Sequence, residues 1–201
     1  MSLPETQIVT DLRLLTPERF ITRWFDESTP YVFGPHRTEY LRWKSHIAGE
    51  LGVSWLDVVL VGSAAVGCSL SPHKRFKPFS SDSDIDIAVM SPHHFDIAWR
   101  WMRRLGADRY RLPQPTQEWV KEHEKRLVYW GSIATDQLLQ YLPFGPEWVV
   151  KLSKLMAAAP ADGRMINVRL YRDHSSLESY LLNSVRRLRS QLGASGTGDL
   201  H

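Results

Sequence analysis

The spacing of apolar residues along the chain predicts most of its helices and strands. Within 36–51 the apolar positions recur at steps of three and four residues, which predicts a helix that ends at Gly52. The β-branched run 55–62 ends in glycine and predicts a buried strand. Residues 84–90 and 165–171 alternate polar and apolar side chains before or within apolar runs. This alternation is typical of strands with two different faces.

Start signals and amphipathic stripes predict the remaining helices. Thr16 is a suitable N-cap and Pro17 a suitable first helical residue, so a helix is expected to run from there to about Asp26. Residues 117–130 fit a helix, or a helix followed by a strand. Apolar stripes predict further helices over 95–106, 131–142, 147–158 and 176–192.

The order of these elements predicts an α/β (α+β) fold, with a small mixed sheet flanked by helices. The 201 residues suit one domain over 1–192. We expect its core in 36–106 and 161–192, with a helical insertion at 107–160. The small, polar segment 193–201 is expected to be a flexible tail.

Composition excludes several classes of protein. With 43% apolar and 23% charged residues the chain is able to bury a core and is not disordered by composition. Its single cysteine, Cys68, excludes an intrachain disulfide and a cysteine-based zinc site. No apolar run is long enough to cross a membrane, and the N-terminus lacks the pattern of a signal peptide. We therefore expect a cytoplasmic protein without a membrane partner.

The richest chemistry lies between the first two predicted strands. Asp84 and Asp86 are two residues apart in a strand, so they project from the same face about 6.5–7 Å apart. Two carboxylates so placed repel each other unless a cation lies between them, and Mg²⁺ prefers such oxygen ligands. Upstream, Gly62 allows close approach of the backbone to a phosphate, and Ser63 offers a hydroxyl donor. The alternative interpretation is that both aspartates are exposed charges on an edge strand.

Gly62-Ser63, Gly67 and the run from Ser83 to Val89 resemble the signature of the DNA polymerase β-like nucleotidyltransferase superfamily. That signature is an apolar residue, Gly-Ser, a variable gap, and Asp-x-Asp between apolar residues. The resemblance implies the polymerase β-like fold, with Gly62 and Ser63 on the nucleotide phosphates. It also implies that Asp84 and Asp86 are catalytic and bind Mg²⁺, with Mn²⁺ as an alternative.

Members of this superfamily usually carry a third carboxylate on a later strand. Here the position between Ile166 and Val168 is Asn167, an amide that is able to ligate a metal but brings no negative charge. We expect Asn167 to be the third position in a degenerate form. Four other acids do not lie between apolar residues of a predicted strand: Asp136, Asp162, Asp173 and Glu178. We expect Asp136 to be exposed on a helix and Asp173 to cap the last helix.

The long gap between Gly62 and Asp84 is basic. Lys74, Arg75 and Lys77 are candidate nucleotide-binding residues in this loop, with an aromatic side chain nearby to stack on a base. The alternative is a solvated loop that Phe76 and Phe79 anchor to the core.

Two other groups of residues leave alternatives open. Trp130 and Trp148 lie in the middle segment, where the pattern of apolar residues is weakest. They are either core residues or the lining of a pocket for a nucleotide base. The helical charges Arg186, Arg187 and Arg189 form a solvated face or contact nucleic acid.

These features favour a Mg²⁺-dependent nucleotidyltransferase that moves a nucleoside monophosphate from a nucleoside triphosphate to a hydroxyl, releasing pyrophosphate. The acceptor stays open between a protein, a nucleic acid and a small molecule. The alternative, motivated by Asn167, is a catalytically degenerate relative that binds nucleotide or a partner protein, as an antitoxin-like or regulatory module. A third hypothesis is a general basic nucleic-acid binder, although a net charge of +3 does not demand one.

Overall fold

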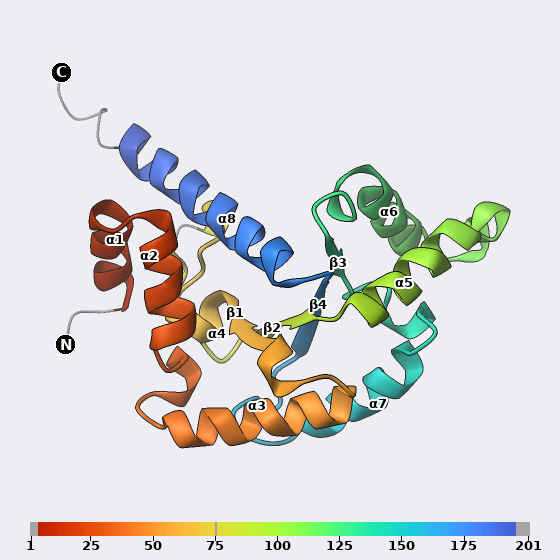
Figure 1. Cartoon of the computed structure of the whole chain (residues 1–201), viewed down its shortest axis with the longest axis horizontal. Coiled ribbons are helices and arrows are strands. Elements are labelled where there is room, and N and C mark those ends of the chain that lie inside the picture. The colour runs from red at the N-terminus through yellow and green to blue at the C-terminus, as the bar shows by residue number, and fades with distance from the viewer. Residues whose placement is uncertain (1–3, 75, 196–201) are drawn as a thin grey trace.

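A four-stranded mixed β-sheet lies at the centre of the molecule (Figure 1). The computed structural model describes residues 4–74 and 76–195. In the sheet order β1-β2-β4-β3, β2 runs antiparallel to β1 and parallel to β4, and β3 runs antiparallel to β4. The predicted mixed α/β architecture is therefore confirmed. The strands are β1 (Val58–Val61), β2 (Ile85–Met90), β3 (Ser132–Ala134) and β4 (Ile166–Tyr171).

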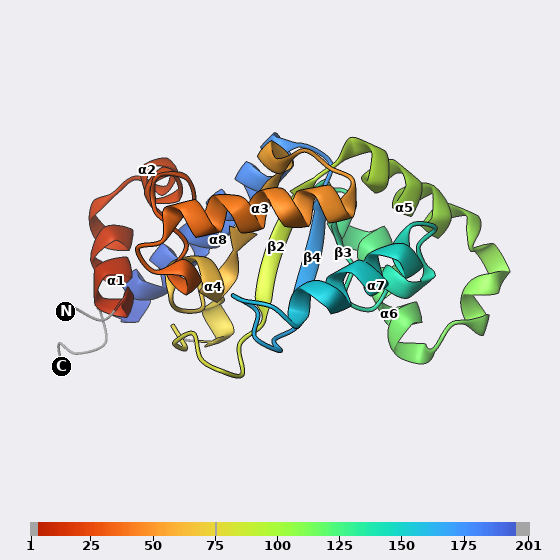
Figure 2. The same cartoon turned by 90° about the horizontal axis from the view of Figure 1, so that it is seen from below.

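One face of the sheet is entirely apolar and buried. Because side chains alternate along a strand, Leu60, Ile87 and Val168 point to this face and belong to the main core. Figure 2 shows α3 and α7 lying across β2 and β4 on this side. The helices that pack against this part of the sheet are α3 (Arg37–Leu51), α5 (Pro92–Arg104) and α7 (Gly145–Met156).

The opposite face is covered over only part of its area. Ala88, Met90 and Tyr171 pack against Leu177 and Leu181 of α8 and form a second apolar cluster. The long helix α8 (His174–Ser195) then continues past α1 and α2, away from the strands (Figure 1). Polar residues at the beginning of β2 and β4 share this face but lie beyond the apolar cluster.

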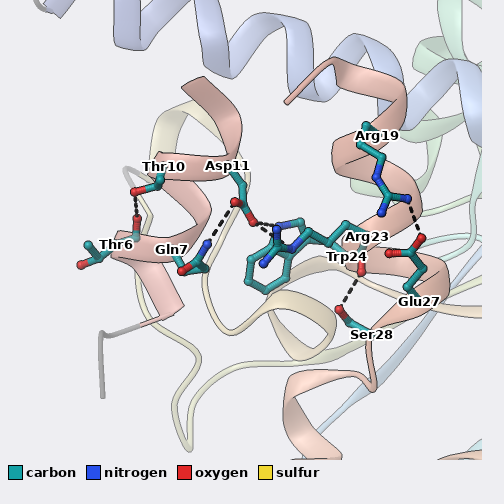
Figure 3. A network of polar contacts seen from close by, with 9 residues as sticks. All are labelled: Thr6, Gln7, Thr10, Asp11, Arg19, Arg23, Trp24, Glu27 and Ser28. Atoms are coloured by element: carbon teal, nitrogen blue, oxygen red, sulfur yellow. Dashed lines mark hydrogen bonds and ion pairs between the residues drawn. The ribbon is translucent and has the colours of Figure 1, made fainter. Parts of the chain in front are cut away.

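A buried carboxylate joins the N-terminal helices to each other (Figure 3). Asp11 is only 4% exposed and accepts hydrogen bonds from Gln7 at 3.0 Å and from the Trp24 indole at 3.1 Å. The Arg23 guanidinium lies 3.2 Å from the same carboxylate. These contacts link α1 (Pro4–Leu14) to the π-helix Thr22–Glu27, which follows α2 (Pro17–Ile21).

Several predicted elements are confirmed with shifted ends. The predicted Thr16 cap accepts a hydrogen bond from the Arg19 N–H at 3.2 Å, and Gly52 ends α3 in the left-handed conformation. The first strand begins three residues later than predicted, because Ser54 accepts the Leu56 N–H and caps a 3₁₀ turn. The strand then gives way to α4 (Gly62–Val66).

The middle of the chain differs from the prediction. Residues 131–142 are not a helix: they contain β3, a turn and the 3₁₀ helix Leu139–Tyr141. Thr135 explains the difference, because its N–H and hydroxyl both donate to the Val168 carbonyl, at 3.3 and 2.7 Å. Tertiary pairing with β4 thus overrides the local pattern. The segment before it is α6 (Gln114–Glu122) followed by a π-helix at His123–Leu127, without a strand.

At the C-terminus, α8 extends to Ser195, so the residues just after 192 are helical rather than a tail. The rest of the predicted tail, 196–201, lies outside the described residues. None of the described helices combines the length and hydrophobicity that a membrane span requires.

Candidate functional site

Asp84 and Asp86 meet the side chain of Asn167 at the uncovered end of the sheet. Asp84 directly precedes β2, Asp86 is its second residue, and Asp86 pairs with Asn167 in the parallel β2–β4 ladder. The Asn167 amide donates to Asp84 Oδ2 at 3.2 Å and to Asp86 Oδ1 at 3.4 Å. Both carboxylates therefore converge on a single point, which the neutral amide nitrogen occupies.

The Gly62 turn lies against the other carboxylate oxygen of Asp86. In the antiparallel β1–β2 ladder Val61 pairs with Asp86, so the turn that follows β1 lies beside the acidic pair. Gly62 has a φ of +66°, and a Cβ built on it would lie 2.6 Å from Asp86 Oδ2. The backbone conformation therefore disfavours any side chain at Gly62, and an added Cβ would also displace the Asp86 carboxylate. Ser63 follows in partly buried surroundings.

The electrostatics of the site disfavour its negative charge. Burial raises the pKa of Asp86 above its ordinary value; the hydrogen bond from Asn167 opposes this rise, and the charge of Asp84 adds to it. Asp136 also raises the pKa of Asp86, and Arg169 lowers it. Carboxylates in such surroundings gain from a cation placed between them.

Asp136 is the residue whose place the sequence did not reveal. Ala134 pairs with Arg169 in the antiparallel β3–β4 ladder, and Thr135 continues the pairing through the Val168 carbonyl. The next residue, Asp136, lies in the turn after this pairing, where its charge acts on both Asp84 and Asp86. The alternating β-branched residues Ile133 and Thr135 after Gly131 were the signal that could have indicated a strand here.

Asp136 is coupled to the acidic pair. It keeps an exposed face, but desolvation raises the pKa of its carboxyl; Arg169 opposes this rise and Asp84 adds to it. Arg169 is itself held by the ring of Tyr180 on α8, with the guanidinium 5.1 Å from the ring centroid. The acids and Arg169 thus form one group of interacting charges across three strands.

His123 supports the strand that leads to Asp136. It is fully buried, donates from Nδ1 to the Trp119 carbonyl at 2.6 Å and accepts the Ala134 N–H on Nε2 at 3.0 Å. Burial lowers the pKa of His123, and the hydrogen bond to Trp119 opposes the decrease. The imidazole is therefore a neutral structural group that fixes the end of β3.

The donor set at the acidic pair fits a hard divalent cation. Two carboxylates meet the Asn167 side chain at one place, and with its amide turned over Asn167 would present an oxygen there in place of the nitrogen that now donates to both. Oxygen is the ligand that Mg²⁺ prefers. Among the described residues, no three His, Cys, Asp or Glu side chains are grouped closely enough to hold a metal ion by themselves. The remaining ligands would therefore come from water and from substrate phosphates, as is usual for Mg²⁺.

The predicted basic loop does not close over the acidic pair. Lys74 ends the 3₁₀ helix Pro72–Lys74, which packs against α8, and both Lys74 and Lys77 are exposed. Among the described residues, no hydrogen bond or ion pair joins either lysine to Asp84 or Asp86. Arg75, the third predicted residue of this group, lies outside the described residues.

The aromatic residues of the loop pack in the manner of anchors. Phe79 lies between Tyr31, edge-on at 6.1 Å, and the Arg164 guanidinium at 5.4 Å. Phe76, with a φ of 55°, is partly buried and packs against the main core. This arrangement favours the anchoring alternative over base stacking for both rings.

The other candidate residues have no contact with the acidic pair among the described residues. Asp173 accepts the Ser176 N–H at 2.8 Å at the start of α8, which confirms its predicted capping role. Asp162 and Glu178 are exposed, on a turn and on α8. Trp148 is buried, whereas Trp130 is 51% exposed.

Comparisons with protein-family models, with curated proteins and with solved structures found no match to this chain.

Proposed function

We propose that this protein is a nucleotidyltransferase with a polymerase β-like fold. It would transfer a nucleoside monophosphate from a nucleoside triphosphate to a hydroxyl acceptor. The observation that carries the proposal is the contact between Gly62 and Asp86. These two residues are twenty-four positions apart in the sequence and pack so closely that a Cβ on Gly62 would lie 2.6 Å from Asp86 Oδ2.

The nucleotide phosphates would lie at the Gly62–Ser63 turn. Gly62 packs directly against the Asp86 carboxylate, so phosphates at this turn would lie next to a cation held by Asp86, and the Ser63 hydroxyl is able to donate a hydrogen bond to them. Asp84 and Asp86 would hold Mg²⁺ (or Mn²⁺), with Asn167 as a neutral third ligand once its amide turns its oxygen inward. When bound, the ion would neutralise the charge of the phosphates and of the departing pyrophosphate.

The chain would supply the rest of the chemistry by positioning and proton transfer. The acceptor oxygen attacks the α-phosphorus, and the bond between that phosphorus and the pyrophosphate oxygen breaks. The acceptor hydroxyl loses its proton to a carboxylate, and Asp136 is the acid of this charge group that makes no direct bond to Asn167. Its raised pKa makes Asp136 a stronger base than an ordinary aspartate.

The test is label transfer from each of the four nucleoside triphosphates labelled at the α-phosphate, with pyrophosphate release measured in parallel. The wild-type protein should release pyrophosphate in the presence of Mg²⁺. Asp84→Ala/Asp86→Ala should reduce the rate at least about 100-fold. Asp82→Ala is the matched control, because Asp82 is an exposed acid of the same loop and its carboxylate accepts a hydrogen bond from the neighbouring Ser81 hydroxyl. Equal rates in the double variant and the control would contradict the proposal.

The Asn167 hydrogen bonds favour one second candidate, a catalytically degenerate module that binds nucleotide or a partner protein. In that case the amide would substitute permanently for the cation by donating to both carboxylates. Nucleotide binding without pyrophosphate release, unchanged by Mg²⁺, would support this alternative over the transferase.

A further inference from the structure

A groove of about 520 Å³ lies along the second half of α8. One wall is α8 itself, through Asn183, Arg186 and Arg187. The facing residues are His73, from the loop between α4 and β2, and Trp130, from the turn before β3. The groove shares no lining residue with the acidic site, so it is a separate surface with its own chemistry.

Two lining residues of the groove are cations, Arg186 and Arg187, and Lys74 directly follows the lining residue His73. Neither the loop 71–79 nor the helical segment 183–192 contains an acidic residue. Arg186 has a weak, exposed ion pair with Glu18 at 3.5 Å. Arg187 and Lys74 have no side-chain hydrogen bond or ion pair within the part of the chain that the structure describes. Their charges are therefore available to an anionic ligand.

Trp130 adds an aromatic surface to these charges. Its side chain is 51% exposed and packs edge-on against Tyr129, which is 84% exposed, with ring centroids 5.4 Å apart. An exposed indole beside these cations offers a flat surface on which a base is able to stack, whereas free phosphate would use the cations alone. Unpaired cations beside exposed aromatic rings are the combination that binds single-stranded nucleic acid.

Each wall of the groove is connected to the acidic site, one along the chain and the other through side-chain contacts. The loop that carries His73 continues directly into Asp84. On the other wall, Tyr180 lies one helical turn before Asn183 and holds Arg169, which shares its sheet face with Asn167. From Asn183 to Gln191 the helix rises about 12 Å, which is longer than one nucleotide.

We infer that this groove binds a single-stranded nucleic acid, and that a hydroxyl of this strand is the acceptor of the transfer. The inference rests on the proposed function for the reaction, but the binding surface stands on its own residues. The strand phosphates would pair with Arg187 and Lys74, and one base would stack on Trp130.

The test is the affinity of the full chain for a fluorescent single strand of about 12 nucleotides. Fluorescence anisotropy would be measured between about 50 and 200 mM salt. Arg187→Gln/Lys74→Gln should weaken binding and reduce the salt slope by about 1.4, or about 0.7 for each lost phosphate contact. Trp130→Ala should weaken binding roughly tenfold, and Trp130→Phe should retain most of the affinity. Arg104→Gln is the matched control, because Arg104 is the last residue of α5, which extends away from α8 (Figures 1 and 2).

Binding that is equal in the double variant and in Arg104→Gln would overturn the inference. So would a poly-glutamate peptide that competes as well as the oligonucleotide, because such a site recognises charge alone. Asp84→Asn/Asp86→Asn should bind the strand as tightly as wild type. If that strand binds but no pyrophosphate is released, the transferase proposal fails and the groove stands. If pyrophosphate is released without any strand binding, the groove fails and the transferase stands.

Discussion

Two carboxylate sites in this protein have opposite electrostatic character. Asp11 is buried and receives donors from Gln7, Trp24 and Arg23, so its charge is fully compensated (Figure 3). Asp84 and Asp86 share one neutral amide donor and repel each other. A carboxylate that serves folding is supplied with its partners by the chain itself. A pair left short of positive charge points instead to a ligand that brings it.

Removing the compensated carboxylate should have the largest effect on stability. Asp11→Ala leaves the Trp24 indole and the Arg23 guanidinium without their acceptor between the N-terminal helices. We expect the free energy of unfolding to fall by about 3 kcal/mol, measured by chemical denaturation. Asp26→Ala, an exposed acid in the same π-helix, should change it by less than about 0.5 kcal/mol. Similar losses in both variants would show that the Asp11 network has no special role.

Adding a methyl group to Gly62, beside the acidic pair, should have the next largest effect. Gly62→Ala combines backbone strain with a Cβ 2.6 Å from Asp86 Oδ2. We expect a loss of about 2 kcal/mol in unfolding free energy together with at least about tenfold lower transfer. Gly163→Ala is the matched control, since its φ is +87° but nothing lies within 4 Å of the added Cβ. If both variants lose equal activity, close approach at Gly62 is not what matters.

Acid should weaken the strand that presents Asp136. Burial lowers the pKa of His123 in the folded protein; the Trp119 carbonyl opposes this, the charge of Arg169 adds to it, and Glu122 opposes it. As the pH falls, the unfolded chain therefore binds a proton at this imidazole near pH 6.5, whereas the folded protein binds it only at lower pH. Stability is complete above that pH and falls below it, by at most about 1.4 kcal/mol per pH unit. His94, whose pKa burial also lowers, acts in the same direction.

The His123 contribution is isolated by comparing denaturation curves of wild type and His123→Gln across this pH range. The variant should retain only the smaller slope that His94 contributes. Identical slopes would show that the proton taken up on unfolding does not bind His123.

The smallest effect is expected from a third negative charge placed beside the acidic pair. Asn167→Asp places a third carboxylate where the amide now bridges Asp84 and Asp86. Mg²⁺ affinity, measured by calorimetry, should rise severalfold because the ligand set gains a negative charge. Glu178→Gln, a charge change on the exposed surface of α8, is the control. Unchanged affinity would place the third ligand elsewhere.

The sequence was sufficient where local signals decide structure. Thr16 and Gly52 mark helix ends by their own backbone chemistry, and the alternation around Asp86 identifies its strand without reference to other residues. The position of Asp136 depends instead on the pairing of Thr135 with Val168, thirty-three residues away. No local pattern encodes such a contact. The groove on α8 was equally hidden, because Trp130 and Arg187 come together through the tertiary fold alone.

The most direct test of the contrast between the two sites is the variant Asp86→Asn, examined for stability and for activity. The pKa of Asp86 is raised in the folded protein. At every pH at which this carboxyl is ionised, its negative charge therefore lowers the stability of the fold. Without metal at pH 7, Asp86→Asn should therefore raise the free energy of unfolding by about 1 kcal/mol. The gain should vanish below pH 3.8, where the unfolded carboxyl is also protonated.

The same preparation should release no pyrophosphate from any nucleoside triphosphate with Mg²⁺ present. A variant that is more stable and inactive would show that Asp86 is retained for chemistry at the expense of stability. An Asp86→Asn protein that unfolds more easily than wild type and keeps its pyrophosphate release would contradict this, and would make Asp86 a structural carboxylate like Asp11.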